Sequence, residues 1–139
     1  MRALVADDER TTIAILTKAL QGCHVEPIVA HDGRAAWDVL SGSKPPALAI
    51  VDWMMPGLDG LQVCRALRAD ADPRLAEIPV VLITGRSDAT DTAAGFDAGV
   101  TDYLTKPFKP SVLLARLHAW LLRSGTARGA GSPPTAPSR

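Results

Sequence analysis

The stretch "ALAIV", residues 47–51, indicates the fold class because it is a continuous run of apolar residues without polar alternation. A strand with one solvated face alternates polar and apolar residues, whereas a strand covered on both faces does not. At least three of the chain's five short apolar runs lack alternation, so they predict the buried strands of a parallel sheet. The other runs are "RALVA" (2–6), "HVEPIVA" (24–30), "PVVLI" (79–83) and "VTDYL" (100–104).

Helical patterns separate these runs. Ile13, Leu16 and Leu20 fall on one helical face after the first run. A leucine-rich segment at 110–123 has the same amphipathic character, and residues 88–99 show it more weakly. Alternation of five strand–helix units predicts a doubly wound (βα)5 domain, an α/β three-layer sandwich.

Pro27 favours one strand order within that class. Proline cannot donate a hydrogen bond to a strand ladder, so it belongs on an edge strand. The flavodoxin-like order 2-1-3-4-5 places the second strand at an edge, whereas the order 3-2-1-4-5-6 buries it. The sequence therefore predicts a flavodoxin-like parallel sheet of order 2-1-3-4-5.

Length and charge limit the classes of function. The 139 residues suit one domain, which we place at residues 1–123, followed by a disordered tail or linker at 124–139. Fifteen basic and fifteen acidic residues cancel, which predicts no direct binding to nucleic acid or to a membrane. No apolar run approaches the roughly 20 residues that span a bilayer. The two cysteines suit a reducing compartment, so we expect a cytoplasmic protein.

Polar residues follow four of the predicted strands at their carboxyl ends, where open α/β sheets form their sites. Asp7 and Asp8 follow the first strand, and Asp52 follows the third. Thr84 follows the fourth strand and Lys106 follows the fifth. We therefore expect these side chains to converge on one pocket.

The three carboxylates in this pocket need a cation. Two unit charges about 4 Å apart repel by about 4 kcal/mol at an effective dielectric constant of 20. Oxygen ligands without histidine or cysteine select Mg²⁺, Mn²⁺ or Ca²⁺ rather than zinc. The loop after the first strand contains no glycine to hold a phosphate, which disfavours a bound nucleotide.

A divalent ion, the Lys106 ammonium and the Thr84 hydroxyl around one carboxylate are suited to phosphoryl transfer. Asp52 is the natural nucleophile because it ends the central strand. Each residue also has a simpler interpretation: acids favour helix N-termini, aspartate opens turns, threonine caps helices, and most lysines are solvated. Only their joint placement at four strand ends indicates a site.

At these residues the sequence resembles the receiver domain of bacterial two-component response regulators, from Met1 to about Arg123. Four motifs carry the resemblance, in order: "ADDE" resembles the metal-binding acids, "DWMMPGLDG" the phosphoacceptor motif, "VVLITG" the hydroxyl switch position and "FDAGVTDYLTKPF" the closing segment.

The resemblance implies that Asp52 accepts a phosphoryl group from a histidine kinase or a histidine phosphotransfer protein. It implies that Mg²⁺, or Mn²⁺ in its place, is bound by Asp8, Asp52 and the backbone carbonyl of Met54, and by Asp7 through water. It further implies that Lys106 contacts the phosphoryl oxygens, and that Thr84 and Tyr103 form the conformational switch. No enzymatic activity is expected beyond the domain's own phosphorylation and dephosphorylation.

Two features depart from a minimal receiver motif. Met54 and Arg86 stand two residues after Asp52 and Thr84, where a bulky side chain and a cation would slow hydrolysis of the acyl phosphate. Leu114 and Leu122 lie off the apolar face of the last helix. They extend the buried face or, as we favour, form an effector-docking or homodimer surface.

Alternative functions remain open at this stage. A haloacid dehalogenase-type enzyme needs a second aspartate where Met54 stands, which disfavours it. A receiver-like scaffold would bind partners without phosphorylation, but Asp52, Lys106 and Thr84 are all present. A plain metal-binding or flavodoxin-like module is disfavoured by the missing phosphate loop.

Overall fold

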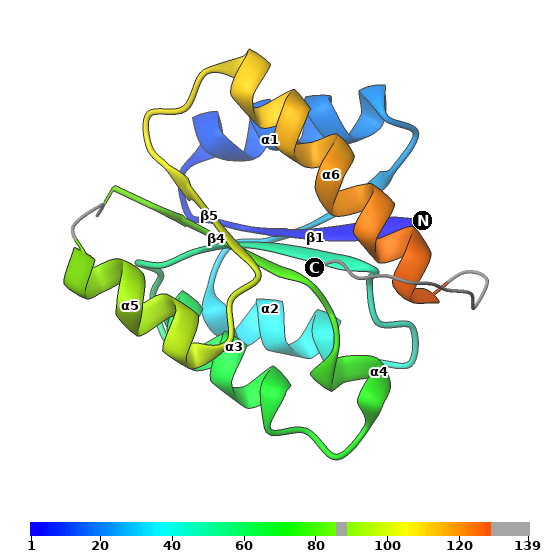
Figure 1. Ribbon diagram of the computed structural model, residues 1–139, viewed down its shortest axis with the longest axis vertical. Helices are drawn as coiled ribbons and strands as arrows, with labels where there is room; N and C mark the ends of the chain where they lie inside the picture. Colours follow the sequence, from blue (N-terminus) through cyan, green and yellow to red (C-terminus); the bar gives the residue numbers. More distant parts are fainter. Residues whose placement is uncertain (86–88, 129–139) are drawn as a thin grey trace.

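The computed structural model describes residues 1–85 and 89–128 and contains a five-stranded parallel sheet (Figure 1). The strand order is β2-β1-β3-β4-β5, as Pro27 and the strand count predict. The strands are β1 (Arg2–Ala6), β2 (Glu26–Ala30), β3 (Leu48–Asp52), β4 (Val80–Thr84) and β5 (Asp102–Thr105). The flavodoxin-like fold is therefore confirmed.

Helices cover both faces of the sheet. Figure 1 shows α1 and α6 on one side and α2, α3 and α5 on the other. The short helix α4 was not predicted, because one helical turn is too brief to show an apolar periodicity. The helices are α1 (Arg10–Gly22), α2 (Gly33–Leu40), α3 (Gly60–Arg68), α4 (Pro73–Ala76), α5 (Ala89–Ala98) and α6 (Pro110–Arg128).

The two-sided cover explains the continuous apolar runs. Leu4 belongs to the core on the side of α2 and α3, whereas its neighbour Val5 belongs to the core on the side of α1 and α6. Successive strand residues point to opposite faces, so both positions must be apolar. Every residue of β3 and β4 is buried.

Pro27 lies on an edge strand, as expected. It stands opposite Ala3 in the β1–β2 register, and β2 has no neighbour on its other side. Residues 24 and 25 precede the strand rather than belonging to it, because His24 adopts a left-handed backbone conformation with φ of 62°.

The last helix extends past the predicted domain boundary. We placed the boundary at residue 123, but α6 continues to Arg128. Residues 124–128 are therefore helical and not part of a disordered tail. The remainder of that predicted tail, residues 129–139, lies outside the described residues. Among the described residues, no helix has the length and apolar character that crossing a membrane requires.

Candidate functional site

Asp7 and Asp52 meet at the carboxyl edge of the sheet, where β1 and β3 end side by side. Asp7 is fully buried, and its backbone N–H donates to the carbonyl of Ala30 at 3.1 Å. One carboxylate oxygen of Asp7 accepts a hydrogen bond from the Glu9 backbone N–H at 2.9 Å. Asp52 is 5% exposed and is the last residue of β3. Both predicted acids therefore occupy the switch point of the sheet.

The loop after Asp52 is held in place by close backbone approaches. A Cβ atom added to Gly60 would lie 2.6 Å from the carbonyl oxygen of Asp52. A Cβ atom added to Gly33 would lie 1.8 Å from the carbonyl oxygen of Leu58. Gly57 forms the predicted turn with φ of +76°. Glycine at these positions lets α2 and α3 pack directly against the loop that carries the site.

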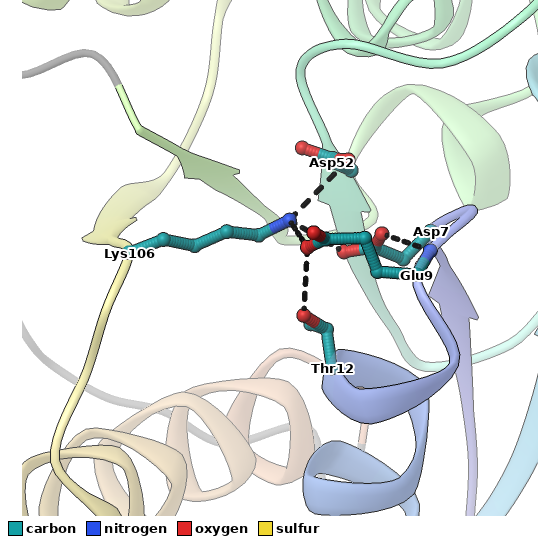
Figure 2. Close-up of polar contacts among 5 residues, drawn as sticks. All are labelled: Asp7, Glu9, Thr12, Asp52 and Lys106. Carbon is teal, nitrogen blue, oxygen red and sulfur yellow. Dashed lines mark hydrogen bonds and ion pairs between the residues drawn. The ribbon is translucent and has the colours of Figure 1, made fainter.

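Lys106 enters the site from the end of β5. Its backbone N–H donates to the Thr84 carbonyl at 2.8 Å, and its bond to Pro107 is cis. Figure 2 shows the extended side chain placing its ammonium among three carboxylates. The Nζ atom lies 2.6 Å from Glu9 Oε1, 3.2 Å from Asp7 Oδ2 and 3.5 Å from Asp52 Oδ2.

Burial and like charge make Asp52 hard to ionise. Desolvation raises the pKa of Asp52 to about 6, with the Asp7 charge and a hydrogen bond to Asp7 acting in the same direction. The Lys106 charge and a backbone hydrogen bond from Met54 oppose this rise only in part. At neutral pH most of the Asp52 population is therefore ionised, as a nucleophile or a metal ligand must be.

Lys106 remains charged in spite of its burial. Desolvation alone would lower the pKa of Lys106, but hydrogen bonding to Glu9 and the charges of Asp52 and Asp7 outweigh it and raise the pKa to about 12. Hydrogen bonding to Lys106 likewise lowers the pKa of Glu9. The site therefore contains a fixed cation at every physiological pH.

The acidic trio of Asp7, Asp8 and Asp52 fits a hard divalent cation. Each of these residues offers a carboxylate oxygen, and the three oxygens lie within 4.8 Å of one another. Asp7 Oδ2 is buried and has no hydrogen-bond partner among the described residues, although Lys106 Nζ is near it. Three carboxylate oxygens so close together suit a hard divalent cation that prefers oxygen ligands.

Thr84 and Tyr103 occupy different surroundings near the site. Thr84 ends β4 beside β3 and is 1% exposed. The half-buried Tyr103 ring contacts the Phe96 ring, with centroids 5.3 Å apart, and its hydroxyl donates to the Thr92 carbonyl at 3.2 Å. A Cβ atom on Gly95 would lie 1.8 Å from the Tyr103 hydroxyl, so this glycine makes room for the ring.

The two side chains that follow Asp52 lie in opposite environments. Trp53 is 5% exposed and packs in the core, as strand alternation predicts, whereas the Met54 side chain is 59% exposed. Asp59 caps α3, and its carboxylate accepts from the Gln62 N–H at 2.9 Å. The predicted contact of Arg86 with the phosphoryl group falls outside the described residues.

Sequence reasoning assigned no role to Glu9 in the site. We interpreted the acids after the first strand as metal ligands or helix-terminal charges, yet Glu9 makes the shortest contact with Lys106. The available signal was the run "DDE", in which a third acid follows two candidate ligands.

The sheet has the order 2-1-3-4-5, and carboxylates and a lysine lie at its switch point. These features define a flavodoxin-like domain with an acidic cluster where such folds form their sites. The chain belongs to the response regulator receiver domain family, whose profile it matches over residues 3–118. It is therefore a receiver domain of the two-component signalling systems.

Known proteins agree with this assignment. Response regulator MprA of Mycolicibacterium vanbaalenii is 43% identical over 133 residues, which are 94% of this chain and 54% of the relative. This chain thus spans about half the length of the curated relatives it matches.

Two solved structures share the fold. The signal receiver domain of a signal transduction histidine kinase from Syntrophus aciditrophicus is 32% identical with a TM-score of 0.78, covering 97% of this chain and 98% of that one. The receiver domain of the Pseudomonas aeruginosa sensor histidine kinase PA1611 has a TM-score of 0.75 at 24% identity, covering 86% and 96%.

Proposed function

We propose that this receiver domain accepts a phosphoryl group on Asp52 from the phosphohistidine of a histidine kinase or of a histidine phosphotransfer protein. The observation that carries the proposal is the position of Asp52 itself. It is a nearly buried carboxylate at the end of the central strand, with an ammonium 3.5 Å away and two further acids beside it. In the transfer, an Asp52 oxygen bonds to phosphorus while the bond from phosphorus to the histidine nitrogen breaks. The electron pair of the broken bond stays on the imidazole.

Asp8, Asp52 and the backbone carbonyl of Met54 would hold the metal directly, with Asp7 bound through water. A divalent ion there neutralises charge that builds up on the phosphoryl oxygens. Mg²⁺ is the proposed ion, and Mn²⁺ accepts the same oxygen ligands. The PA1611 receiver domain has a magnesium ion coordinated in its active-site cleft, but at 24% identity it shares only the fold. The assignment to this chain therefore depends on its own acidic trio.

Lys106 and Thr84 are the proposed contacts of the transferred group. The Lys106 ammonium would neutralise a phosphoryl oxygen, and the Thr84 hydroxyl would donate to another. Phosphorylation adds about two negative charges and three acceptor oxygens, enough to reorganise a buried hydroxyl nearby. Tyr103, packed over Gly95 and Phe96, is the proposed reporter of that change on the α5–β5–α6 face.

The exposed face of α6 is the proposed partner surface. Leu114 and Leu122 are 42% and 73% exposed, whereas Leu113 and Leu117 on the same helix are buried. Apolar side chains so exposed on one helix suit an effector or a second copy of the domain. No direct contact with nucleic acid is proposed. The proposed location is the cytoplasm, which suits the response regulators to which the chain is similar. Sedimentation of the phosphorylated protein, compared with Leu122→Glu, tests for a dimer through this face.

The acyl phosphate is proposed to hydrolyse slowly, and the domain to catalyse no reaction beyond gaining and losing this group. The Met54 side chain stands two residues after the nucleophile, where its bulk obstructs an attacking water molecule. A phosphorylated half-life of only seconds would contradict this part of the proposal.

Intact-mass measurement after incubation with phosphoramidate, with and without Mg²⁺, tests the proposed function. We expect one phosphoryl addition that requires Mg²⁺ and is absent from Asp52→Asn. Asp59→Asn is the matched control, because it changes the second aspartate of the same loop and should still be phosphorylated. If the wild-type protein gains no phosphoryl group in any condition, the proposal is wrong and the scaffold function is favoured.

A further inference from the structure

Glu9 lies at the rim of the site and outside the acidic trio. Its side chain is 59% exposed, whereas those of Asp7 and Asp52 are 1% and 7% exposed. Glu9 nevertheless makes the shortest contact with Lys106, at 2.6 Å. The Lys106 ammonium is thus shared between two buried acids that belong to the trio and one exposed acid that does not.

The Glu9 carboxylate is held toward Lys106. Glu9 is the N-cap residue of α1, but its side chain makes no capping hydrogen bond. Instead, Glu9 Oε1 accepts a hydrogen bond from the Thr12 hydroxyl at 3.1 Å, and the Glu9 backbone N–H donates to Asp7 at 2.9 Å. Figure 2 shows Thr12 on one side of this carboxylate and the ammonium on the other. These contacts orient an otherwise exposed side chain.

An ammonium and a divalent ion cannot both remain close to the same two carboxylates without strong repulsion between them. Lys106 Nζ lies 3.2 Å from Asp7 Oδ2 and 3.5 Å from Asp52 Oδ2, and both residues belong to the trio. Like charges at such short distances repel strongly at the dielectric of a half-buried site. When the trio takes a divalent ion, Lys106 must therefore withdraw from Asp7 and Asp52 while keeping a negative partner.

We propose that Glu9 is that partner: a positioning residue that retains the Lys106 ammonium at the rim and so lets the trio bind a divalent cation. This inference deepens the proposed function and rests on it, since it concerns the same site. Without Glu9, the ammonium's remaining acidic partners among the described residues are Asp7 and Asp52, and it competes with the ion for them. Glu9 thus acts on the ion through Lys106.

A double-mutant cycle on Mg²⁺ affinity, measured by titration calorimetry without any phosphoryl donor, tests the proposal. The four proteins are the wild type, Glu9→Gln, Lys106→Met and the double variant. We expect Glu9→Gln to weaken Mg²⁺ binding by about threefold to tenfold when Lys106 is present. We expect less than about a twofold effect when Lys106 is methionine, because no ammonium then competes.

Two further variants separate the effect of the orientation of Glu9 from the effect of removing an exposed negative charge. Thr12→Val removes the hydroxyl that orients Glu9 without changing the charge, and should weaken Mg²⁺ binding in the same direction by a smaller factor. Glu26→Gln removes an exposed carboxylate at the opposite edge of the sheet and should leave the affinity unchanged.

The possible outcomes are distinct. Equal weakening by Glu9→Gln in both Lys106 backgrounds would mean that Glu9 acts on the ion directly, and would overturn the inference. No weakening in either background would also overturn it, while leaving the proposed function intact. If the wild-type protein bound no Mg²⁺, the proposed function would itself be wrong and this inference with it.

Discussion

Two charged regions of this domain differ in how their charges are compensated. In the first, the half-buried Arg68 guanidinium extends from α3 and donates to neutral acceptors among the described residues. It joins α3 to the end of α4, the approach to β4 and the turn before β5. Its hydrogen bonds go to the Gly99 carbonyl at 2.9 Å, the Ala76 and Ile78 carbonyls at 3.0 and 2.7 Å, and the Thr101 hydroxyl at 3.5 Å.

The second region, around Asp52, brings like charges together. Asp7 and Asp52 are both buried acids, one ammonium serves them together with Glu9, and Asp7 Oδ2 has no hydrogen-bond partner among the described residues. A charge that stabilises the fold is thus surrounded by neutral groups that it satisfies. The charge proposed to carry out the chemistry is left partly uncompensated, at a cost in stability.

Arg68→Met should give the largest change in stability and destabilise the fold by roughly 3 kcal/mol, because it leaves several backbone carbonyls without their donor. Urea unfolding measures this change. Arg65→Met on the same helix is the matched control, since Arg65 is exposed and should change stability by less than about 0.5 kcal/mol. If Arg68→Met lowered the free energy of unfolding by less than about 1 kcal/mol, the Arg68 hydrogen bonds would not stabilise the fold as described.

Asp52→Asn should change the stability of the domain in the opposite direction. Without metal at neutral pH, it should stabilise the domain by about 1–3 kcal/mol, since it removes a buried charge next to Asp7. Urea unfolding in the presence of a chelator measures this gain. Saturating Mg²⁺ should reduce or reverse it, because only the wild-type protein keeps its full set of ligands. A variant less stable than the wild type without metal would contradict the comparison.

The stability difference between Asp52→Asn and the wild type should depend on pH. Folding raises the pKa of Asp52 to about 6 from its ordinary 3.8, so ionisation disfavours the folded state. The cost is fully present above pH 6, declines as the folded protein takes up a proton below pH 6, and is absent below pH 3.8. Unfolding of both proteins in chelator from pH 8 to pH 4 measures the difference. A difference independent of pH would show that the Asp52 charge is not its cause.

Asp59→Ala should give the smallest effect. Asp59 and Gln62 form reciprocal hydrogen bonds of 2.9 and 2.8 Å at the start of α3, and losing this cap should cost about 1 kcal/mol. Phosphorylation by phosphoramidate should persist. Loss of phosphorylation in a folded Asp59→Ala protein would show that Asp59 takes part in phosphorylation, and would contradict its assignment as a helix cap alone.

The fold and most of the site could be predicted from the sequence. The continuous apolar run at 47–51 predicts a strand covered on both faces, and Pro27 predicts an edge strand because proline lacks a backbone donor. Both signals can be read from a short stretch of sequence. Asp52 and Lys106 could be placed near each other because the carboxyl ends of parallel strands share one edge of the sheet.

The finer contacts could not be predicted, because they depend on side-chain directions and on segments distant in sequence. Arg68 belongs to α3, but its acceptors come from residues 76–101, which follow it in the chain. In the sequence Glu9 is one of three adjacent acids, and only the structure shows that the Lys106 side chain contacts it. The end of α6 was placed too early because the small and polar residues after 123 resemble a linker.

The most direct test of the central claim is to locate the phosphoryl group. The protein is phosphorylated with phosphoramidate and Mg²⁺, reduced with borohydride, which converts an aspartyl phosphate to homoserine, and mapped by peptide mass spectrometry. We expect homoserine at position 52 and nowhere else. A phosphorylated protein whose homoserine appears at Asp7, Asp8 or Asp59, with Asp52 unchanged, would contradict it.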